Sequence, residues 1–273
     1  MKWLRGGARF VLVSVGIIVI TAIGVDATQY MSGSQSALGI LATQFVDSEG
    51  CPKDMVLIEL GSGNFCIDKY EVSPGDSCPQ ERPVTALMTK ENIESSECSA
   101  QSAAELMPWT SVTYLQAKEL CAKRKMRLPN NEEWFEAALG TSEALGTCNL
   151  SGELKKAGDF SECVSLRGSV DMIGNAWEWI DGEVSNGTYQ NRQLPSDGYI
   201  EGVDTNGVAI TTTSTPVALM NDDYFWHEAD GVKAMMRGGF YGSGKDGGVY
   251  SLYIKSEPTF SSAAIGFRCV TDV

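Results

Sequence analysis

Eight cysteines, distributed between Cys51 and Cys269, constrain the fold of this chain more than any other feature. No two of them form a CxxC pair, which argues against a zinc ribbon and against a thioredoxin-like redox site. Their even number favours disulfide bonds, and a set of buried free thiols is the alternative. Because each disulfide stabilises a folded chain by about 2 to 4 kcal/mol, we expect a loop-rich fold that such bonds hold together.

The length and composition of the chain limit the class of protein. The chain has 273 residues, of which 43% are hydrophobic, enough for one large or two small globular domains with a core. The formal net charge is -14, which would repel nucleic-acid phosphates, so we expect no nucleic acid as a partner. His227 is the single histidine, which excludes an iron site built from several imidazoles.

The first residues are typical of a segment directed to a membrane. After three basic residues, an uncharged hydrophobic run extends over residues 10–25 and ends before Asp26. This run is near the lower limit for spanning a bilayer, and it also fits an export signal with Val25 and Ala27 before the cleavage point. In a third alternative, a pilin-like stem, the polar stretch after the run continues as a helical stalk. All three alternatives place the rest of the chain outside the cytoplasm.

We therefore divide the chain into three parts. Residues 1–27 are a signal anchor or signal peptide containing a hydrophobic helix, residues 28–50 are a linker or helical stalk, and residues 51–273 are the folded domain. The protein is expected to be exported, either secreted or anchored in the membrane at the cell surface. The number of cysteines agrees with such an oxidising location.

The folded part begins with signals for a hairpin and two helices. Residues 51–72 alternate apolar and polar side chains around a Gly-Ser-Gly-Asn turn at 61–64, as a hairpin with one buried face does. Thr113 with Gln116, and Asn130 with Glu133, form capping-box patterns in front of apolar stripes. Residues 181–230 show no sustained period, so we expect loops there, resting on a small mixed sheet.

Three motifs resemble a known family. They are RLPNNEEW at 127–134, DMIGNAWEW at 171–179, and the segment 237–268, which begins with Arg-Gly-Gly and ends with Ile-Gly-Phe-Arg. Together they resemble the formylglycine-generating enzyme (sulfatase-modifying factor) family, a branch of the C-type-lectin-like proteins. The resemblance implies an α+β fold with small mixed sheets, two helices and long loops. It also implies a disulfide between Cys121 and Cys269, and for the other cysteines we expect local closure: Cys51 with Cys66, Cys78 with Cys98, and Cys148 with Cys163.

The resemblance also bears on catalysis. In the copper-dependent enzyme of the family, two cysteines after the Arg-Gly-Gly motif bind the metal and carry out the oxidation. Their positions correspond here to Ser243 and Gly248, and neither residue provides the thiolate that Cu(I) requires. We therefore expect no catalytic residues and no copper, and we interpret the domain as a binding module.

A structural calcium ion is a further implication of the resemblance. In the family, the positions of Asp171, Gly174, Ala176 and Glu178 hold the ion through carboxylate and backbone carbonyl oxygens, the hard ligands that calcium prefers. We expect Ca²⁺ at these residues, in a structural role. A turn held only by hydrogen bonds is the alternative.

The segment between Arg237 and Arg268 mixes aromatic and short polar side chains, a composition typical of adaptable recognition surfaces. We expect the two arginines themselves to bind carbonyls or carboxylates of the scaffold. The segment also resembles the variable region of proteins diversified by retroelements, with RGG at 237, GVY at 248 and IGFR at 265. That resemblance, together with the composition, gives these candidate ligand-binding positions: Phe240, Tyr241, Gly242, Ser243, Asp246, Tyr253, Ser256, Phe260, Ser262 and Ala264.

The expected function is binding of a protein or glycan ligand on another cell or virus, with contact to the membrane through the N-terminal run. Two alternatives stay open: an oxidase of the formylglycine-generating type, and a pilin-like or structural surface subunit. For the segment 237–268 itself, the simplest alternative is a lectin-like loop without a dedicated ligand.

Overall fold

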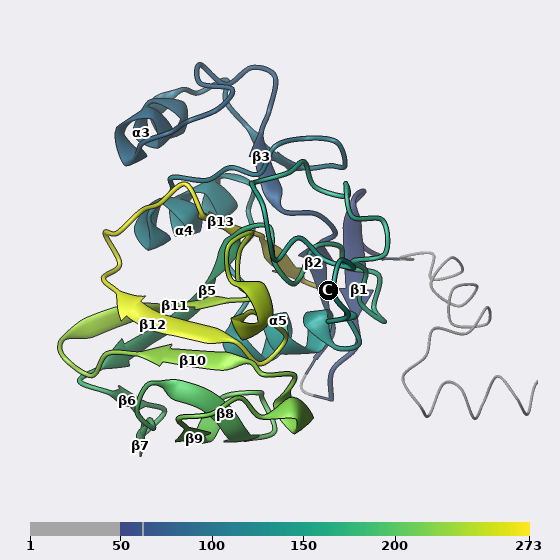
Figure 1. Ribbon diagram of the computed structural model, residues 1–273. Coiled ribbons are helices and arrows are strands. Elements are labelled where there is room, and N and C mark those ends of the chain that lie inside the picture. The colour runs from purple at the N-terminus through teal and green to yellow at the C-terminus, as the bar shows by residue number, and fades with distance from the viewer. Residues whose placement is uncertain (1–49, 62) are drawn as a thin grey trace, which may run out of the picture. The chain divides into compact units, whose positions relative to one another are not determined.

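The computed structural model describes residues 50–61 and 63–273 and shows an α+β arrangement (Figure 1). Within this part, the helices are α3 (Ala86–Glu94), α4 (Tyr114–Lys123) and α5 (Asn131–Ala138), with 3-10 turns η1 (Ala218–Met220) and η2 (Gly244–Asp246). The strands are β1 (Met55–Ile58), β2 (Phe65–Asp68), β3 (Val72–Pro74), β4 (Ala100–Ser102), β5 (Trp177–Ser185), β6 (Thr188–Tyr189), β7 (Arg192–Gln193), β8 (Gly198–Val203), β9 (Ala209–Thr213), β10 (Tyr224–His227), β11 (Val232–Arg237), β12 (Leu252–Ser256), β13 (Ile265–Phe267) and β14 (Val270–Asp272).

The expected N-terminal helix and stalk lie, apart from Gly50, outside the described residues. Among the residues that the structure describes, no helix is both long enough and apolar enough to cross a membrane.

Most of the strands belong to one sheet of nine strands. Its order is β7-β6-β5-β11-β12-β10-β8-β9, and β13 lies beside β5. The pairs β13–β5 and β10–β12 are parallel, whereas β11 is antiparallel to both of its neighbours. Two smaller sheets, β1-β2-β14 and β3-β4, complete the fold. The architecture is therefore mixed, as expected, but its main sheet is larger than the small sheets that we predicted.

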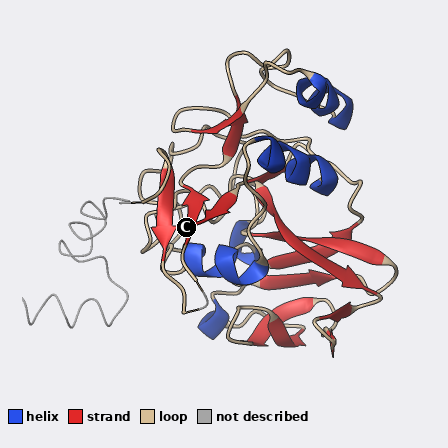
Figure 2. Ribbon diagram, turned by 180° about the vertical axis from the view of Figure 1, so that it is seen from behind, coloured by secondary structure: helices blue, strands red, loops and turns tan. Residues whose placement is uncertain are grey.

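Strand β12 shows how this sheet separates two cores. Leu252 and Ile254 are fully buried and belong to the same core cluster as Trp134 of α5. Tyr253, which lies between them in the sequence, packs against the other cluster, which contains Trp177 and the buried face of α4. Alternate residues of a strand point to opposite faces, so a single strand serves both cores. In both views of the fold, α4 lies between α3 and the sheet (Figures 1 and 2).

The predicted hairpin and both predicted helix starts are confirmed. Strands β1 and β2 pair antiparallel, and the last strand, β14, adds to the other side of β2. At α4, the Thr113 hydroxyl accepts a hydrogen bond from the Gln116 amide at 3.1 Å, and Gln116 Oε1 accepts one from the Thr113 amide. Asn130 and Glu133 form the same reciprocal pair at α5, at 3.0 and 2.8 Å. Each pair satisfies backbone donors that the first helical turn leaves free.

Two parts of the fold differ from the prediction. Helix α3 was not expected, although Thr85 caps it by accepting from the Met88 amide at 3.2 Å. Its buried residues are Thr89, Asn92 and Ile93, so it has no apolar stripe that the sequence could reveal. The segment 181–230, predicted as loops, contains the end of β5 and strands β6 to β10. These strands are short, and the register shifts twice between β8 and β9, which removes regular alternation from the sequence.

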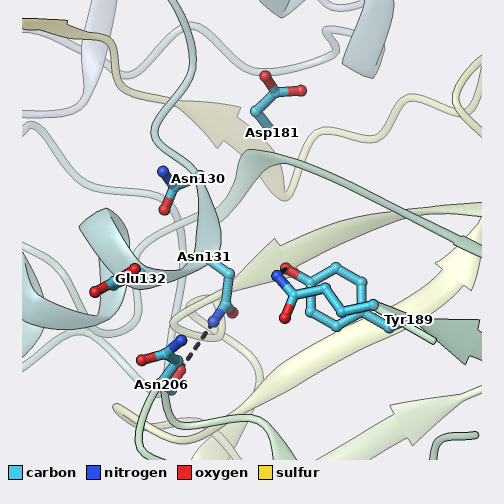
Figure 3. A pocket seen from close by; sticks show the side chains of 7 residues that line it. Asn130, Asn131, Glu132, Asp181, Tyr189 and Asn206 are labelled. Atoms are coloured by element: carbon cyan, nitrogen blue, oxygen red, sulfur yellow. Dashed lines mark hydrogen bonds between the residues drawn. The ribbon is translucent and has the colours of Figure 1, made fainter. Parts of the chain in front are cut away.

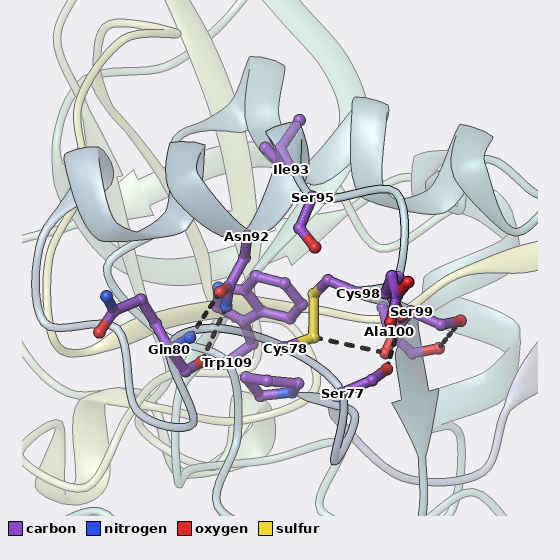
Figure 4. The surroundings of a disulfide bond; sticks show 12 residues. Ser77, Cys78, Gln80, Asn92, Ile93, Ser95, Cys98, Ser99, Ala100 and Trp109 are labelled. Carbon is purple, nitrogen blue, oxygen red and sulfur yellow. Dashed lines mark hydrogen bonds between the residues drawn. A yellow bond between two sulfur atoms is a disulfide. The ribbon is translucent and has the colours of Figure 1, made fainter.

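Four disulfides form the four expected pairs, Cys51–Cys66, Cys78–Cys98, Cys121–Cys269 and Cys148–Cys163. Figure 4 shows the bond between Cys78 and Cys98, which closes the excursion that carries α3. Beside it, the Asn92 side chain donates to the Gln80 carbonyl and accepts from the Gln80 amide, both at 2.8 Å. The disulfide and the two Asn92 hydrogen bonds thus hold in place the segment that carries α3, which has little apolar surface to bury.

Candidate functional site

The Arg237 side chain, at the end of β11, is fully buried and organises the base of the segment 237–268. It donates to Asn131 Oδ1 at 2.6 and 2.9 Å, and to the backbone carbonyls of Gly207 at 2.9 Å and Val249 at 3.2 Å. Burial lowers the pKa of this guanidinium to about 10. Arg237 therefore binds carbonyls of the scaffold, as predicted, and does not face a ligand.

The residue after it requires a glycine. Gly238 has a φ of +91°, and a Cβ atom there would lie 2.5 Å from the Met172 carbonyl oxygen. Its own carbonyl accepts from the Gly174 amide at 3.0 Å. The Arg-Gly-Gly motif thus brings the chain against the turn 171–176 with no room for a side chain.

The turn 171–176 and the start of β5 contain the four residues expected to hold calcium. Glu178 is buried, and both of its carboxylate oxygens accept hydrogen bonds from Arg268, at 2.5 to 2.9 Å. Glu178 Oε2 also accepts from Trp134 Nε1 at 2.7 Å. Asp171 Oδ2 accepts from the Gly158 amide at 2.7 Å, and burial raises the pKa of Asp171 to about 6. The turn is therefore already held by hydrogen bonds and one buried ion pair.

This donor set does not fit a calcium ion in the expected form. Calcium binds several oxygens whose negative charge balances its own. Each Glu178 oxygen already accepts two hydrogen bonds, and the Arg268 guanidinium supplies the positive charge beside it. Gly174 and Ala176 are buried in the same turn.

A row of five aromatic side chains crosses the main sheet. It consists of Trp177 on β5, Tyr253 on β12, Trp226 and Tyr224 on β10, and Tyr199 on β8, and we call it the aromatic row. Neighbouring ring centroids lie 5.0 to 6.1 Å apart, and two of the pairs are edge to face. Trp177 is buried under α4, whereas the other four rings are partly exposed. The row therefore extends from the core to the surface on one face of the sheet.

Nine of the ten candidate positions are at least partly exposed, and the tenth, Ser256, is buried. Ser256 is 6% exposed and pairs with Ala234 of β11, so it cannot contact a ligand from this position. Tyr253 belongs to the aromatic row. Phe240 packs against the same core cluster as Trp226 and Tyr253. Phe240 and Tyr241 pack edge to face with centroids 5.2 Å apart.

The remaining exposed candidates lie in two loops. Gly242, Ser243 and Asp246 belong to the turn that follows β11 and includes η2. Phe260, Ser262 and Ala264 belong to the loop before β13, and the Trp177 amide donates to the Ala264 carbonyl at 2.9 Å. This loop therefore passes beside the inner end of the aromatic row. Phe260 is 48% exposed, so its ring is accessible at the surface.

Sequence reasoning missed three rings of the row: Tyr199, Tyr224 and Trp226 all lie outside the segment 237–268. One signal could have found two of them. Residues 224–227 read Tyr-Phe-Trp-His, and only Phe225 is buried, which is the alternation of a half-exposed strand. Tyr199 pairs across from Tyr224 in the register of β8 and β10, a contact that the sequence does not indicate.

At the two positions that correspond to the enzyme's cysteines, 243 and 248, the structure shows other contacts. Ser243 Oγ accepts from the Phe240 amide at 2.9 Å and closes the turn after β11. At Gly248, a Cβ atom would lie 2.1 Å from Asp223 Oδ1. The buried Asp223 carboxyl therefore fills the space that a cysteine side chain at 248 would need.

A polar pocket of about 360 Å³ lies at the start of α5 (Figure 3). Asn131 connects this pocket to Arg237, because its Oδ1 accepts from Arg237 while its Nδ2 donates to the Asn206 carbonyl at 2.8 Å. Asp181 at the rim pairs with Lys118 at 2.8 Å. None of these residues was a sequence candidate. The lining consists of Asn130, Asn131, Glu132, Asp181, Tyr189, Gln190 and Asn206.

Comparison with solved structures returns proteins of low sequence identity. The Major Tropism Determinant M1 variant is 20% identical with a TM-score of 0.48, over 82% of this chain and 53% of that one. PvdO from Pseudomonas aeruginosa is 16% identical with a TM-score of 0.42, over 77% and 81%. Treponema denticola variable protein 1 is 15% identical with a TM-score of 0.41, over 82% and 100%. The chain thus spans about half the length of the tropism determinants.

No curated protein sequence matches the chain. Residues 146–273 match the family model described as the sulfatase-modifying factor enzyme 1-like domain. The matched range contains DMIGNAWEW and the segment 237–268 with its Arg-Gly-Gly and Ile-Gly-Phe-Arg ends, whereas the third motif, RLPNNEEW at 127–134, lies outside it. Residues 146–273 are therefore similar to the sulfatase-modifying factor enzyme 1-like domain, the family that the sequence motifs resemble.

Proposed function

We propose that this chain is a non-catalytic ligand-binding protein with a C-type-lectin-like scaffold, exported and either secreted or held at the cell surface. Its recognition surface consists of the exposed part of the aromatic row together with the nine exposed candidate positions. The ligand is a protein or glycan on another cell or virus. Four disulfides support export, because such bonds persist in oxidising compartments.

The continuous aromatic row carries this proposal. Four partly exposed rings on three strands of one sheet form a contiguous patch, and such patches on soluble proteins usually mark interaction sites. The rings hold one another by close packing, so they would lose little conformational entropy when a ligand binds. Tyrosine and tryptophan also supply large contact areas with a polar group at the edge.

A polar rim accompanies the row. Lys255 lies two residues from Tyr253 on β12 and pairs with Asp197 at 2.8 Å. Both side chains are about one-third exposed. An aromatic centre bordered by charged groups is the usual composition of an interface, and it also suits stacking of sugar rings between polar groups.

Alanine substitutions in the row test this function. The full chain, purified in detergent, would be applied to a glycan array and to intact cells, and retained binding partners would then be titrated. We expect Trp226→Ala and Tyr253→Ala to weaken binding roughly 10-fold or more, because buried aromatic anchors dominate interfaces. Lys245→Ala is the matched control, since this exposed side chain lies in the segment 237–268 but outside the row.

The proposal fails if the wild-type chain retains no glycan and no cell-surface protein. It fails equally if both aromatic variants bind as the wild type does while their circular dichroism shows an intact fold. A loss in Lys245→Ala equal to that in the aromatic variants would place the contact elsewhere in the segment.

The family match favours one alternative, copper-dependent oxidation, because the family is described by an enzyme. The structure at positions 243 and 248 argues against this alternative. Ser243 closes a turn, and the Asp223 carboxyl fills the space that a side chain at Gly248 would need. Incubation with copper and a cysteine peptide of the sulfatase type decides between the two functions. We expect no aldehyde, and any turnover would establish the oxidase.

A further inference from the structure

The carboxyl groups of the buried Asp223 and the partly buried Glu143 lie directly beneath the segment that joins η2 to β12. Glu143 Oε1 accepts from the Val249 amide at 3.0 Å, and Asp223 Oδ2 accepts from the Tyr250 amide at 2.7 Å. The other oxygen of each group, Glu143 Oε2 and Asp223 Oδ1, is buried and has no hydrogen-bond donor among the described residues. Asp223 is fully buried and points toward Gly248.

The two carboxyl groups lie close together, because they accept hydrogen bonds from the amides of successive residues, Val249 and Tyr250. Two ionised carboxylates are both acceptors, so these groups can hydrogen-bond to each other only when one of them carries a proton. Without that proton, two like charges and two unsatisfied oxygens would be buried together, which is costly.

Arg237 contacts the backbone of the same two residues. It donates to the carbonyls of Val249 and Tyr250 at 3.2 and 3.5 Å, while the acids accept from the amides of these residues. Within the described part of the chain, Arg237 has no ion pair. One proton on the acid pair leaves a single negative charge, which balances the single positive charge of Arg237. A divalent cation in its place would leave the buried group with excess positive charge.

We propose that Glu143 and Asp223 share one proton at neutral pH and that this acid pair, with Arg237, fixes residues 248–250 beneath the recognition surface. The geometry assigns the pair a role as a pH-dependent support for the loop between η2 and β12. The pair is separate from the turn 171–176, and its action does not depend on which ligand the surface binds.

Apart from Arg237, no neighbouring charged group among the described residues supplies the positive charge that would let both acids of the pair ionise. Asp222 pairs with Lys245 at 3.7 Å, and Asp246 lies near Asp222 on the same rim. The Tyr250 phenol has its pKa raised by burial and then by the two acids, so it stays neutral. Arg237 is therefore the one buried cation that faces the pair within the described residues.

The direction of the pH effect follows from these contacts. Burial raises the pKa of Glu143 from 4.5 to about 7, and burial followed by the charge of Glu143 raises that of Asp223. The folded chain therefore holds a proton that the unfolded chain has released above pH 4.5. The stability from this pair is fully present below that pH and is lost as the pH rises through about 7.

Thermal unfolding of the full chain across pH tests the proposal. We expect the Tm of the wild type to fall by several degrees between about pH 6 and about pH 8.5. Glu143→Gln should fall much less, because the glutamine amide donates to Asp223 Oδ1 at every pH. Asp222→Asn is the matched control and should keep the wild-type dependence, since this neighbouring carboxyl is not in the pair. Comparing variants cancels the contribution of other titrating groups.

Infrared difference spectra between the wild type and Glu143→Gln provide a second readout. Burial also raises the pKa values of Asp171 and Glu71, so these groups contribute a protonated-carboxyl band in both proteins. We expect the wild type to carry an additional carbonyl band below about pH 7 that is lost at higher pH and that Glu143→Gln, if folded, lacks. Equal pH dependence of Tm in wild type and Glu143→Gln would overturn the proposal, and so would the absence of the band.

A cation at the pair would also overturn it. In that case, millimolar CaCl₂ or NaCl would raise the Tm of the wild type at high pH but not that of Glu143→Gln. We expect both salts to act equally on the two proteins. All of these measurements use the chain without a ligand, so they stand or fall independently of the recognition surface.

Discussion

The two arginines at the ends of the segment 237–268 are alike in burial and differ in charge compensation. Each is fully buried, and each donates to backbone carbonyls. Arg268 also forms an ion pair with the buried Glu178. Arg237 instead contacts the amide oxygen of Asn131 and lies 5.7 and 5.5 Å from the ring centroids of Trp134 and Phe135.

This difference separates two ways of holding the same segment. At Arg268 a full negative charge lies in direct contact, so the segment's end is fixed by a strong and inflexible pair. At Arg237 the charge contacts only carbonyl dipoles and aromatic faces, and the acid pair that balances it acts across the backbone of residues 249 and 250 without a direct ion pair. The loop that carries the exposed candidate positions begins at the less strongly compensated arginine. We infer that the two ends of the segment should respond differently to substitution.

Removing Arg268 should have the largest effect. Arg268→Met leaves the Glu178 carboxylate buried with Trp134 as its remaining side-chain donor. Losing one partner of a buried ion pair typically costs about 3 to 5 kcal/mol, so we expect the free energy of unfolding in urea to fall by that amount. The double variant Arg268→Met with Glu178→Met should recover part of the loss. If the double variant is as unstable as the sum of the singles, the pair is not coupled.

Removing Arg237 should cost less. Arg237→Met leaves several buried carbonyls and Asn131 without a donor, but it leaves no directly paired carboxylate. Unsatisfied buried acceptors suggest a loss of about 2 to 3 kcal/mol in urea unfolding. Arg237→Lys should recover only a fraction, because an ammonium group cannot reach carbonyls on several sides. A loss in Arg237→Met larger than that in Arg268→Met would reverse the comparison of the two ends.

The sequence indicated which arginines matter but not how they differ. Both lie in glycine-containing motifs, which predicted buried positions that bind the scaffold. Glu178, the partner of Arg268, was singled out from the sequence, but the family resemblance assigned its carboxylate to calcium. The distance between residues 178 and 268 in the sequence is long, so no local pattern could show that the two side chains meet.

The candidate site was foreseen in part for a related physical reason. Tyr253 and Phe240 lie inside the recognised segment, whereas Tyr199 and Trp226 join them only through strand pairing across β8, β10 and β12. Capping boxes and the hairpin were predictable because their signals span a few residues. Ser256 was misplaced because a resemblance identifies a position without showing which face of its strand it occupies.

The smallest of these effects should come from Gly248, where the acid pair meets the weaker end of the segment. In Gly248→Ala the new methyl group would press on Asp223 Oδ1, since its ideal position lies 2.1 Å away. Overpacking of this kind costs about 1 to 2 kcal/mol when a neighbour can move aside, and Asp223 is the neighbour that must move. Gly61→Ala is the control, because nothing lies within 4 Å of that site. Urea unfolding of Gly248→Ala, Asp223→Ala and the double variant measures the coupling, and strictly additive losses would show that Gly248 and Asp223 do not share the space that the structure gives them.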